Sequence, residues 1–165
     1  MNAVVVGIDP ASATGVIVLG LGCGEIIRDY DVDTAHRLGL YLLYQEIRAI
    51  GKNAQVVAWG IERPVYGGHV VAIASIAERV GVCRAAIQGC ASDSEIRLWS
   101  PSEWKKRSPL NLPKLKRGRL AEGAYIDYGT HYWQWPFRST DAVDAAFIAR
   151  ATRFWYFYEH KQATA

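Results

Sequence analysis

Short hydrophobic or alternating segments along the chain predict five β-strands. These segments cover residues 3–9, 14–20, 25–32, 55–62 and 95–100. Each has the length and the Val- or Ile-rich pattern that is typical of strands. A tight turn separates the first two segments, so they should form an antiparallel hairpin.

Longer segments with apolar residues at helical spacing alternate with the later strands. Residues 34–50 and 70–88 show this spacing, and Gly51 is expected to end the first helix. The stretch from Ser100 to Glu103 is a helix start, because a Ser cap is followed by Pro and by Glu three residues later. The remaining expected elements are a helix at 119–129 that ends at Gly129, an aromatic loop at 130–138, and a last helix from Ser139 or Thr140 to about Phe157.

The order of these elements predicts an α/β fold with a mixed β-sheet of about five strands and helices on both faces. The length of 165 residues, half of them hydrophobic, suits one domain over residues 1–165. No apolar run reaches transmembrane length and no signal peptide is recognisable, so a soluble cytoplasmic protein is expected. Cys23, Cys83 and Cys90 form no metal-binding or disulfide pattern and are expected to be reduced.

Four acidic residues stand out against this pattern. Asp9 ends the first strand and Glu62 ends the fourth, while Asp141 and Asp144 share one face of the last helix. Carboxylates that meet in a fold repel one another and raise one another's pKa, and a divalent cation removes this conflict. Carboxylate oxygens are natural ligands of Mg²⁺ and Mn²⁺.

Each of these residues also has a simpler interpretation. Asp9 stands before Pro10 and could start a turn. Glu62 could pair with Arg63 at the surface, and acidic residues in the first turn of a helix favour the helix dipole. The simpler interpretations weaken when all four residues are considered together, because two strand ends and one helix face can meet in this architecture.

A basic segment, "KKRSPLNLPKLKRGR" at 105–119, holds seven of the 19 Lys and Arg residues and no acid. Net charge is only +3, so this concentration is more informative than the total. A solvated loop would explain it, but beside an acidic metal site it favours a phosphate clamp. The DNA-binding candidates are Lys105, Lys106, Arg107, Lys114, Lys116, Arg117 and Arg119.

Three stretches, "GIDPASATG", "GIERP" and "STDAVDAAFIA", resemble the acidic motifs of RuvC-type Holliday junction resolvases, which belong to the RNase H-like superfamily. The order and spacing of the motifs fit along nearly the whole chain. The resemblance implies that Asp9, Glu62, Asp141 and Asp144 are the catalytic, metal-binding residues of a nuclease acting in DNA recombination and repair. It further implies two Mg²⁺ ions per site, with Mn²⁺ as a substitute, and hydrolysis of phosphodiesters in branched DNA.

The resemblance also implies DNA contacts outside the acidic motifs. One lysine of the basic segment should lie near the cleaved phosphate, and Tyr66 matches a bulky residue that enters the junction, although it could pack locally instead. Ala11 stands where the family usually has Gly, and "SPLNLPKLKRGR" replaces a Gly-rich segment.

A junction has two strands to cut, which favours a homodimer. The stripe of Ile73, Ile76 and Val80 is the candidate interface, unless it simply covers the sheet.

Two other functions are compatible with parts of the sequence. A phosphate-binding ATPase or sugar-kinase-like domain begins with a similar strand, Asp and small-residue loop, but it usually needs a second domain. A non-catalytic nucleic-acid-binding module would not require all four carboxylates. Cleavage of branched DNA therefore remains the favoured prediction.

Overall fold

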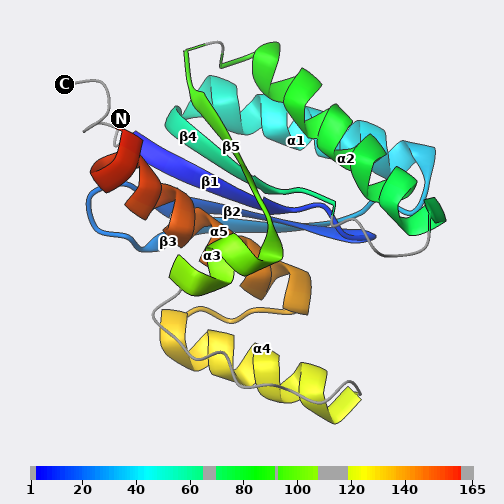
Figure 1. The fold of residues 1–165 in the computed structure, drawn as a ribbon, viewed down its shortest axis with the longest axis vertical. Coiled ribbons are helices and arrows are strands. Elements are labelled where there is room, and N and C mark those ends of the chain that lie inside the picture. Colours follow the sequence, from blue (N-terminus) through cyan, green and yellow to red (C-terminus); the bar gives the residue numbers. More distant parts are fainter. Residues whose placement is uncertain (1–2, 65–69, 92, 108–118, 161–165) are drawn as a thin grey trace.

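The computed structural model describes residues 3–64, 70–91, 93–107 and 119–160 (Figure 1). Its strands are β1 (Ala3–Asp9), β2 (Ala13–Gly20), β3 (Ile26–Asp33), β4 (Gln55–Glu62) and β5 (Glu95–Trp99). They form one sheet in the order β3-β2-β1-β4-β5, in which β1 pairs antiparallel with β2 and parallel with β4. The predicted mixed sheet and the β1–β2 hairpin are therefore confirmed.

The described helices are α1 (Arg37–Asn53), α2 (Val70–Gln88), α3 (Pro101–Arg107), α4 (Arg119–Trp133) and α5 (Thr140–Trp155), followed by a π-helical turn, η1 (Tyr156–His160). Helices α1 and α2 cover one face of the sheet and α5 covers the other, whereas α4 lies outermost, beyond α5 (Figure 1). Within the described residues, none of these helices combines the length and the apolar character needed to cross a membrane.

Alternation along β1 decides which residues meet which helix. Val4, Val6 and Ile8 belong to the core under α1 and α2. Val5 belongs to the core under α5, so Gly7 and Asp9, at alternate positions, share its face. By the same rule Glu62 shares the face of Ala58 on β4, which also packs under α5. The carboxylates of both strands are therefore on the side of the sheet that α5 covers.

Two glycines let α5 approach the sheet closely. A Cβ atom at Gly7 would lie 2.1 Å from the carbonyl oxygen of Ala145, and one at Gly15 would lie 2.4 Å from that of Asp141. The predicted cap, Ser139, begins the helix: its Oγ accepts from the Ala142 N–H at 3.0 Å and donates to Asp31 at 2.8 Å. These contacts fix the first turn of α5 against β2 and β3.

Several predicted helix boundaries are wrong, and two of them are wrong because the helix continues through the glycine that was expected to end it. Helix α1 begins at Arg37 and continues through Gly51, where a Cβ would lie 2.5 Å from the sulfur of Cys90. Helix α4 likewise continues through Gly129 to Trp133, so the first part of the expected aromatic loop is helical. At the C-terminal end, α5 stops at Trp155 and the π-helical turn follows.

Two of the three residues in the predicted stripe of α2, Ile76 and Val80, pack on the sheet, whereas Ile73 is half-buried and belongs to neither core cluster. Val80 is buried in the core that α2 forms with the sheet, and Ile76 packs against that core. The alternative interpretation, that the stripe covers the sheet, is therefore correct for both residues.

Candidate active site

The structure gathers the four acidic residues at one end of the sheet, on the side that α5 covers. Asp9 and Glu62 are the last residues of two neighbouring parallel strands, in which Ile8 is the register partner of Ile61. Asp141 and Asp144 lie in the first two turns of α5, which the glycine contacts hold against the sheet. Their catalytic role remains a prediction, but the proximity on which it depends is present.

The electrostatic cost of this arrangement is largest at Asp9, which is 8% exposed. Burial raises the pKa of Asp9 well above its ordinary value, and the charges of Glu62, Asp144 and Asp141 raise it further. Burial, and then the charge of Asp144, raises the pKa of Asp141 to about 6. The carboxylates thus act on one another as like charges in a partly dry site.

A tryptophan holds Glu62. The Nε1–H of the buried Trp104 donates to Oε2 of Glu62 at 2.6 Å. The alternative ion pair of Glu62 with Arg63 does not form. Nη2 of Arg63 lies 3.7 Å from Oε2 of Glu103, so Arg63 pairs with that residue. Burial raises the pKa of Glu62, and the Trp104 hydrogen bond opposes that rise.

The predicted helix start orients α3 and therefore Trp104. Oε2 of Glu103 accepts from the backbone N–H of Ser100 at 2.7 Å, which closes the capping box. This places Trp104 one turn into the helix, where its ring is buried. The cap is thus one cause of the position of Glu62.

A tyrosine holds Asp144. The hydroxyl of Tyr125, on α4, donates to Oδ1 of Asp144. Burial and the charge of Asp144 raise the pKa of Tyr125, so the phenol stays protonated and acts as a donor. This hydrogen bond also supports the ionised form of Asp144, whose pKa burial raises.

Of the two lysines of the basic segment that the structure describes, Lys105 and Lys106, Lys105 is the one whose charge acts on the carboxylates. Its charge lowers the pKa values of Asp9, Glu62 and Asp144 against the effects that raise them. Its Nζ lies 4.9 Å from the centre of the Trp104 ring, and this contact links the exposed cation to the group that holds Glu62.

The other predicted DNA contacts are placed less directly. Lys106 is exposed on α3. Arg107 donates two hydrogen bonds from Nη2 to Glu159, at 2.9 and 3.0 Å, so its role in DNA binding remains a prediction that would require this pair to open. Tyr66, Lys114, Lys116, Arg117 and the side chain of Arg119 lie outside the described residues.

The donor set fits a divalent cation in its chemistry. Among the described His, Cys, Asp and Glu side chains, no group of three or more is arranged to hold a metal ion. Two of the four carboxylates are instead engaged by neutral donors, Trp104 and Tyr125. Buried, mutually repelling carboxylates are nevertheless the oxygen ligands that Mg²⁺ and Mn²⁺ favour.

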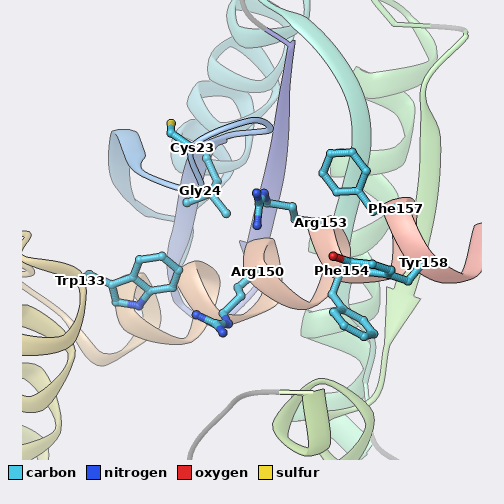
Figure 2. A pocket seen from close by; sticks show the side chains of 9 residues that line it. Cys23, Gly24, Trp133, Arg150, Arg153, Phe154, Phe157 and Tyr158 are labelled. Atoms are coloured by element: carbon cyan, nitrogen blue, oxygen red, sulfur yellow. The ribbon is translucent and has the colours of Figure 1, made fainter.

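A separate pocket of about 450 Å³ lies at the opposite end of α5 (Figure 2). Arg150, Arg153 and the aromatic rings of Trp133 and Phe157 line it. Arg153 donates to the carbonyl oxygens of Leu21 and Gly22, at 2.6 and 3.0 Å, and Arg150 donates to the hydroxyl of Tyr132. These guanidinium groups therefore hold the fold together.

Sequence reasoning did not identify Trp104 or Tyr125. Trp104 carries a weak signal, because it is the apolar residue of a capped helix that leads into a basic run. Tyr125 carries no comparable signal, since its partner lies 19 residues away on another helix. Only the packing of α4 on α5 reveals its contact.

Comparisons with known proteins give the same fold. No family model and no curated protein sequence matches the chain. The chain is similar to Thermus thermophilus RuvC in complex with a Holliday junction substrate, with a TM-score of 0.71, 14% identity and coverage of 93% of this chain and 94% of the other. A second structure of T. thermophilus RuvC gives a TM-score of 0.67 and 15% identity, with coverage of 93% and 95%.

The yeast mitochondrial Holliday junction resolvase is also similar, with a TM-score of 0.54, 14% identity and coverage of 98% of this chain and 84% of the other. The fold is therefore the RNase H-like fold of RuvC-type resolvases, as the three acidic motifs imply.

Proposed function

We propose that this chain, which has the fold of RuvC-type resolvases, is a metal-dependent endonuclease that resolves Holliday junctions and related branched DNA. The observation that carries the proposal is the gathering of Asp9, Glu62, Asp141 and Asp144 from two strands and one helix into a single site. Such a costly arrangement of like charges is typical of functional sites.

The four carboxylates would hold two Mg²⁺ ions, which Mn²⁺ could replace. Bound there, the ions would supply an activated water and stabilise the charge that develops at the leaving oxygen. Asp9 is the most rigid ligand, because its strand pairs on both sides, with β2 and β4. Asp141 is the least constrained, since it lies in the first turn of α5.

The remaining residues of the site would bind and orient the DNA. Lys105 lies near the carboxylates, and its charge suits an oxygen of the cleaved phosphate. Trp104 would keep Glu62 turned toward the site. Lys106, Arg107, Lys114, Lys116, Arg117 and Arg119 would contact further phosphates, and Tyr66 would enter the junction. Neutralising six phosphates would give a log–log salt slope of roughly −5.

A homodimer completes the proposal, because two sites are needed to cut two strands symmetrically. Val70 and Val71, at the start of α2, are 80% and 81% exposed and are better interface candidates than Ile76 and Val80, which pack on the sheet. Light scattering of the protein on a sizing column would measure the state directly. A monomer at the concentrations that cleave DNA would contradict this part of the proposal.

The test of the function is cleavage of a synthetic four-way junction beside a linear duplex and a Y-shaped duplex. We expect preferential cutting of the junction with Mg²⁺ or Mn²⁺ and none with EDTA. Asp9→Asn is the inactive control, and Asp127→Asn, an exposed acid on α4, is its matched counterpart. Equal cutting of all three substrates would support a nuclease activity but would contradict selectivity for Holliday junctions. Failure to cut any of them would overturn both.

A further inference from the structure

Tyr125 brings a neutral hydroxyl into the carboxylate site. It belongs to α4, the helix that lies outermost in the fold (Figure 1). Its hydroxyl donates to Oδ1 of Asp144. A phenol is a single-point donor on a stiff ring, so its position is set by where its helix lies. The orientation of Asp144 therefore depends on how α4 docks against α5.

Helix α4 also lies close to α5 one turn away from this hydrogen bond. Gly129 lies four residues after Tyr125, and a Cβ there would lie 2.7 Å from Cγ2 of Val143, the residue before Asp144. Further along, the rings of Tyr132 and Trp133 pack on Phe147 of α5, with centroid distances of 5.7 and 5.8 Å. The absence of a side chain at position 129 thus permits the helix spacing at which Tyr125 reaches Asp144.

We propose that Tyr125 is a positioning residue, which holds the Asp144 carboxylate in the orientation that cation binding requires. This inference rests on the proposed function. In this proposal Tyr125 acts through its hydrogen bond to Asp144, and no direct role toward DNA or the reacting atoms is assigned to it. Residues that orient a metal ligand by a hydrogen bond typically contribute about 10- to 100-fold to metal affinity. The same helix offers a matched control, because the Tyr128 hydroxyl is buried without a hydrogen-bond partner among the described residues.

The experiment compares Tyr125→Phe with Tyr128→Phe. Binding of Mn²⁺ to the full chain is measured by calorimetry without DNA, and circular dichroism verifies the fold of each variant. We expect the Kd for Mn²⁺ to rise by about tenfold or more in Tyr125→Phe and to stay unchanged in Tyr128→Phe. In junction cleavage, the Mg²⁺ concentration for half-maximal rate should rise by a similar factor, with a smaller change in the rate at saturating Mg²⁺.

An unchanged Kd in Tyr125→Phe would overturn the proposal. Tighter Mn²⁺ binding would also overturn it and would show that the hydroxyl obstructs the site. Because the binding arm uses no DNA, a wild-type protein that binds Mn²⁺ but cleaves no junction would refute the proposed function and leave the Tyr125 comparison valid. A wild-type protein that binds no Mn²⁺ would overturn both.

A second pair of variants tests the docking of α4 with Tyr125 intact. Gly129→Ala adds a methyl group against Val143 and should weaken Mn²⁺ binding as Tyr125→Phe does. Adding Val143→Ala makes room for that methyl group and should restore binding toward the wild-type Kd. Wild-type affinity in Gly129→Ala, or no recovery in the double variant, would contradict the dependence of Asp144 on α4.

Discussion

Both ends of α5 carry charged side chains, but the fold accommodates these charges differently at the two ends. At the C-terminal end, Arg153 is bound by the carbonyl oxygens of Leu21 and Gly22, and Arg150 by the Tyr132 hydroxyl. At the N-terminal end, Asp141 and Asp144 lie beside two more carboxylates, with their pKa values raised. The helix dipole favours the sign of charge at each end but does not explain this difference.

The difference separates charges that stabilise the fold from charges that we propose to be functional. A guanidinium group that donates to backbone carbonyls ties a helix to a turn and lowers the free energy of the folded chain. Carboxylates gathered from β1, β4 and α5 do the opposite, and such groups cluster where chemistry is carried out. Substitution of the acidic end should therefore change activity, and substitution of the basic end should change stability.

The largest effect is expected for Asp144→Asn. Loss of a ligand should reduce junction cleavage by more than about a hundredfold, beyond the range typical of residues that only orient ligands. Since the substitution also removes a repelling charge, the free energy of unfolding in EDTA should stay equal or rise at pH 7. Gel-based cleavage rates and urea titrations measure the two quantities. A variant that cleaves at the wild-type rate would place Asp144 outside the site.

Two buried tryptophans sharpen the comparison, one bound to a carboxylate of the acidic site and one bound to α5 near its C-terminal end. Trp104 donates to Glu62 at 2.6 Å, and Trp99 donates to Thr152 near the C-terminal end of α5 at 2.9 Å. We expect Trp104→Phe to lower junction cleavage at limiting Mg²⁺ by about tenfold, because Glu62 loses its donor. Trp99→Phe should leave the cleavage rate within about twofold of wild type. Both substitutions should lower the free energy of unfolding by a similar amount, of order 1 kcal/mol.

Stability measured in parallel makes this pair decisive. Both substitutions remove one hydrogen bond and some buried ring area. A general loss of packing would therefore lower the cleavage activity of the two variants alike. If the two variants lose the same fraction of activity, Trp104 has a packing role only, and the distinction between the two ends of α5 loses this support.

The sheet and the location of the carboxylates were predictable from sequence for a physical reason. Strand alternation in β1 and β4 and the cap at Ser139 are local signals, and they determine which faces Asp9, Glu62 and Asp144 share. The helix ends predicted at Gly51 and Gly129 were wrong because these glycines are needed for close packing against Cys90 and Val143. No local sequence pattern reveals these long-range contacts.

The residues that orient the carboxylates were not predictable for the same reason. Tyr125 meets Asp144, and Trp104 meets Glu62, only after separate elements pack together. Their residue types are typical of a core, so the sequence pattern favours packing as their role. Lys105 is one of seven basic candidates in the sequence; among the described ones, Lys105, Lys106 and Arg107, it is the one whose charge acts on Asp9, Glu62 and Asp144, because α3 begins directly after β5 and lies beside them.

The basic end of α5 should respond in stability alone. Arg153→Met keeps much of the packing but leaves two carbonyl oxygens without their donor, which should lower the free energy of unfolding by about 1–3 kcal/mol. Arg150→Met loses one bond to a tyrosine hydroxyl and should cost less. Below the melting temperature both variants should cleave junctions at close to the wild-type rate. A cleavage defect in either variant, at full folding, would assign a function to this end as well.

The smallest effect concerns pH. The folded pKa of Asp141 is raised to about 6, chiefly by burial, whereas an unfolded Asp titrates near 3.9. The folded state therefore binds this proton more tightly, and the free energy of unfolding in EDTA should fall as pH rises from about 4 through 6. Asp141→Asn should make this fall shallower, and Mg²⁺ should oppose it by binding the ionised folded state. Melting curves across this range measure both quantities. An equal slope in wild type and Asp141→Asn would mean that Asp141 is solvated like an ordinary surface acid. The raised pKa values at this end of α5 would then be confined to Asp9, Glu62 and Asp144.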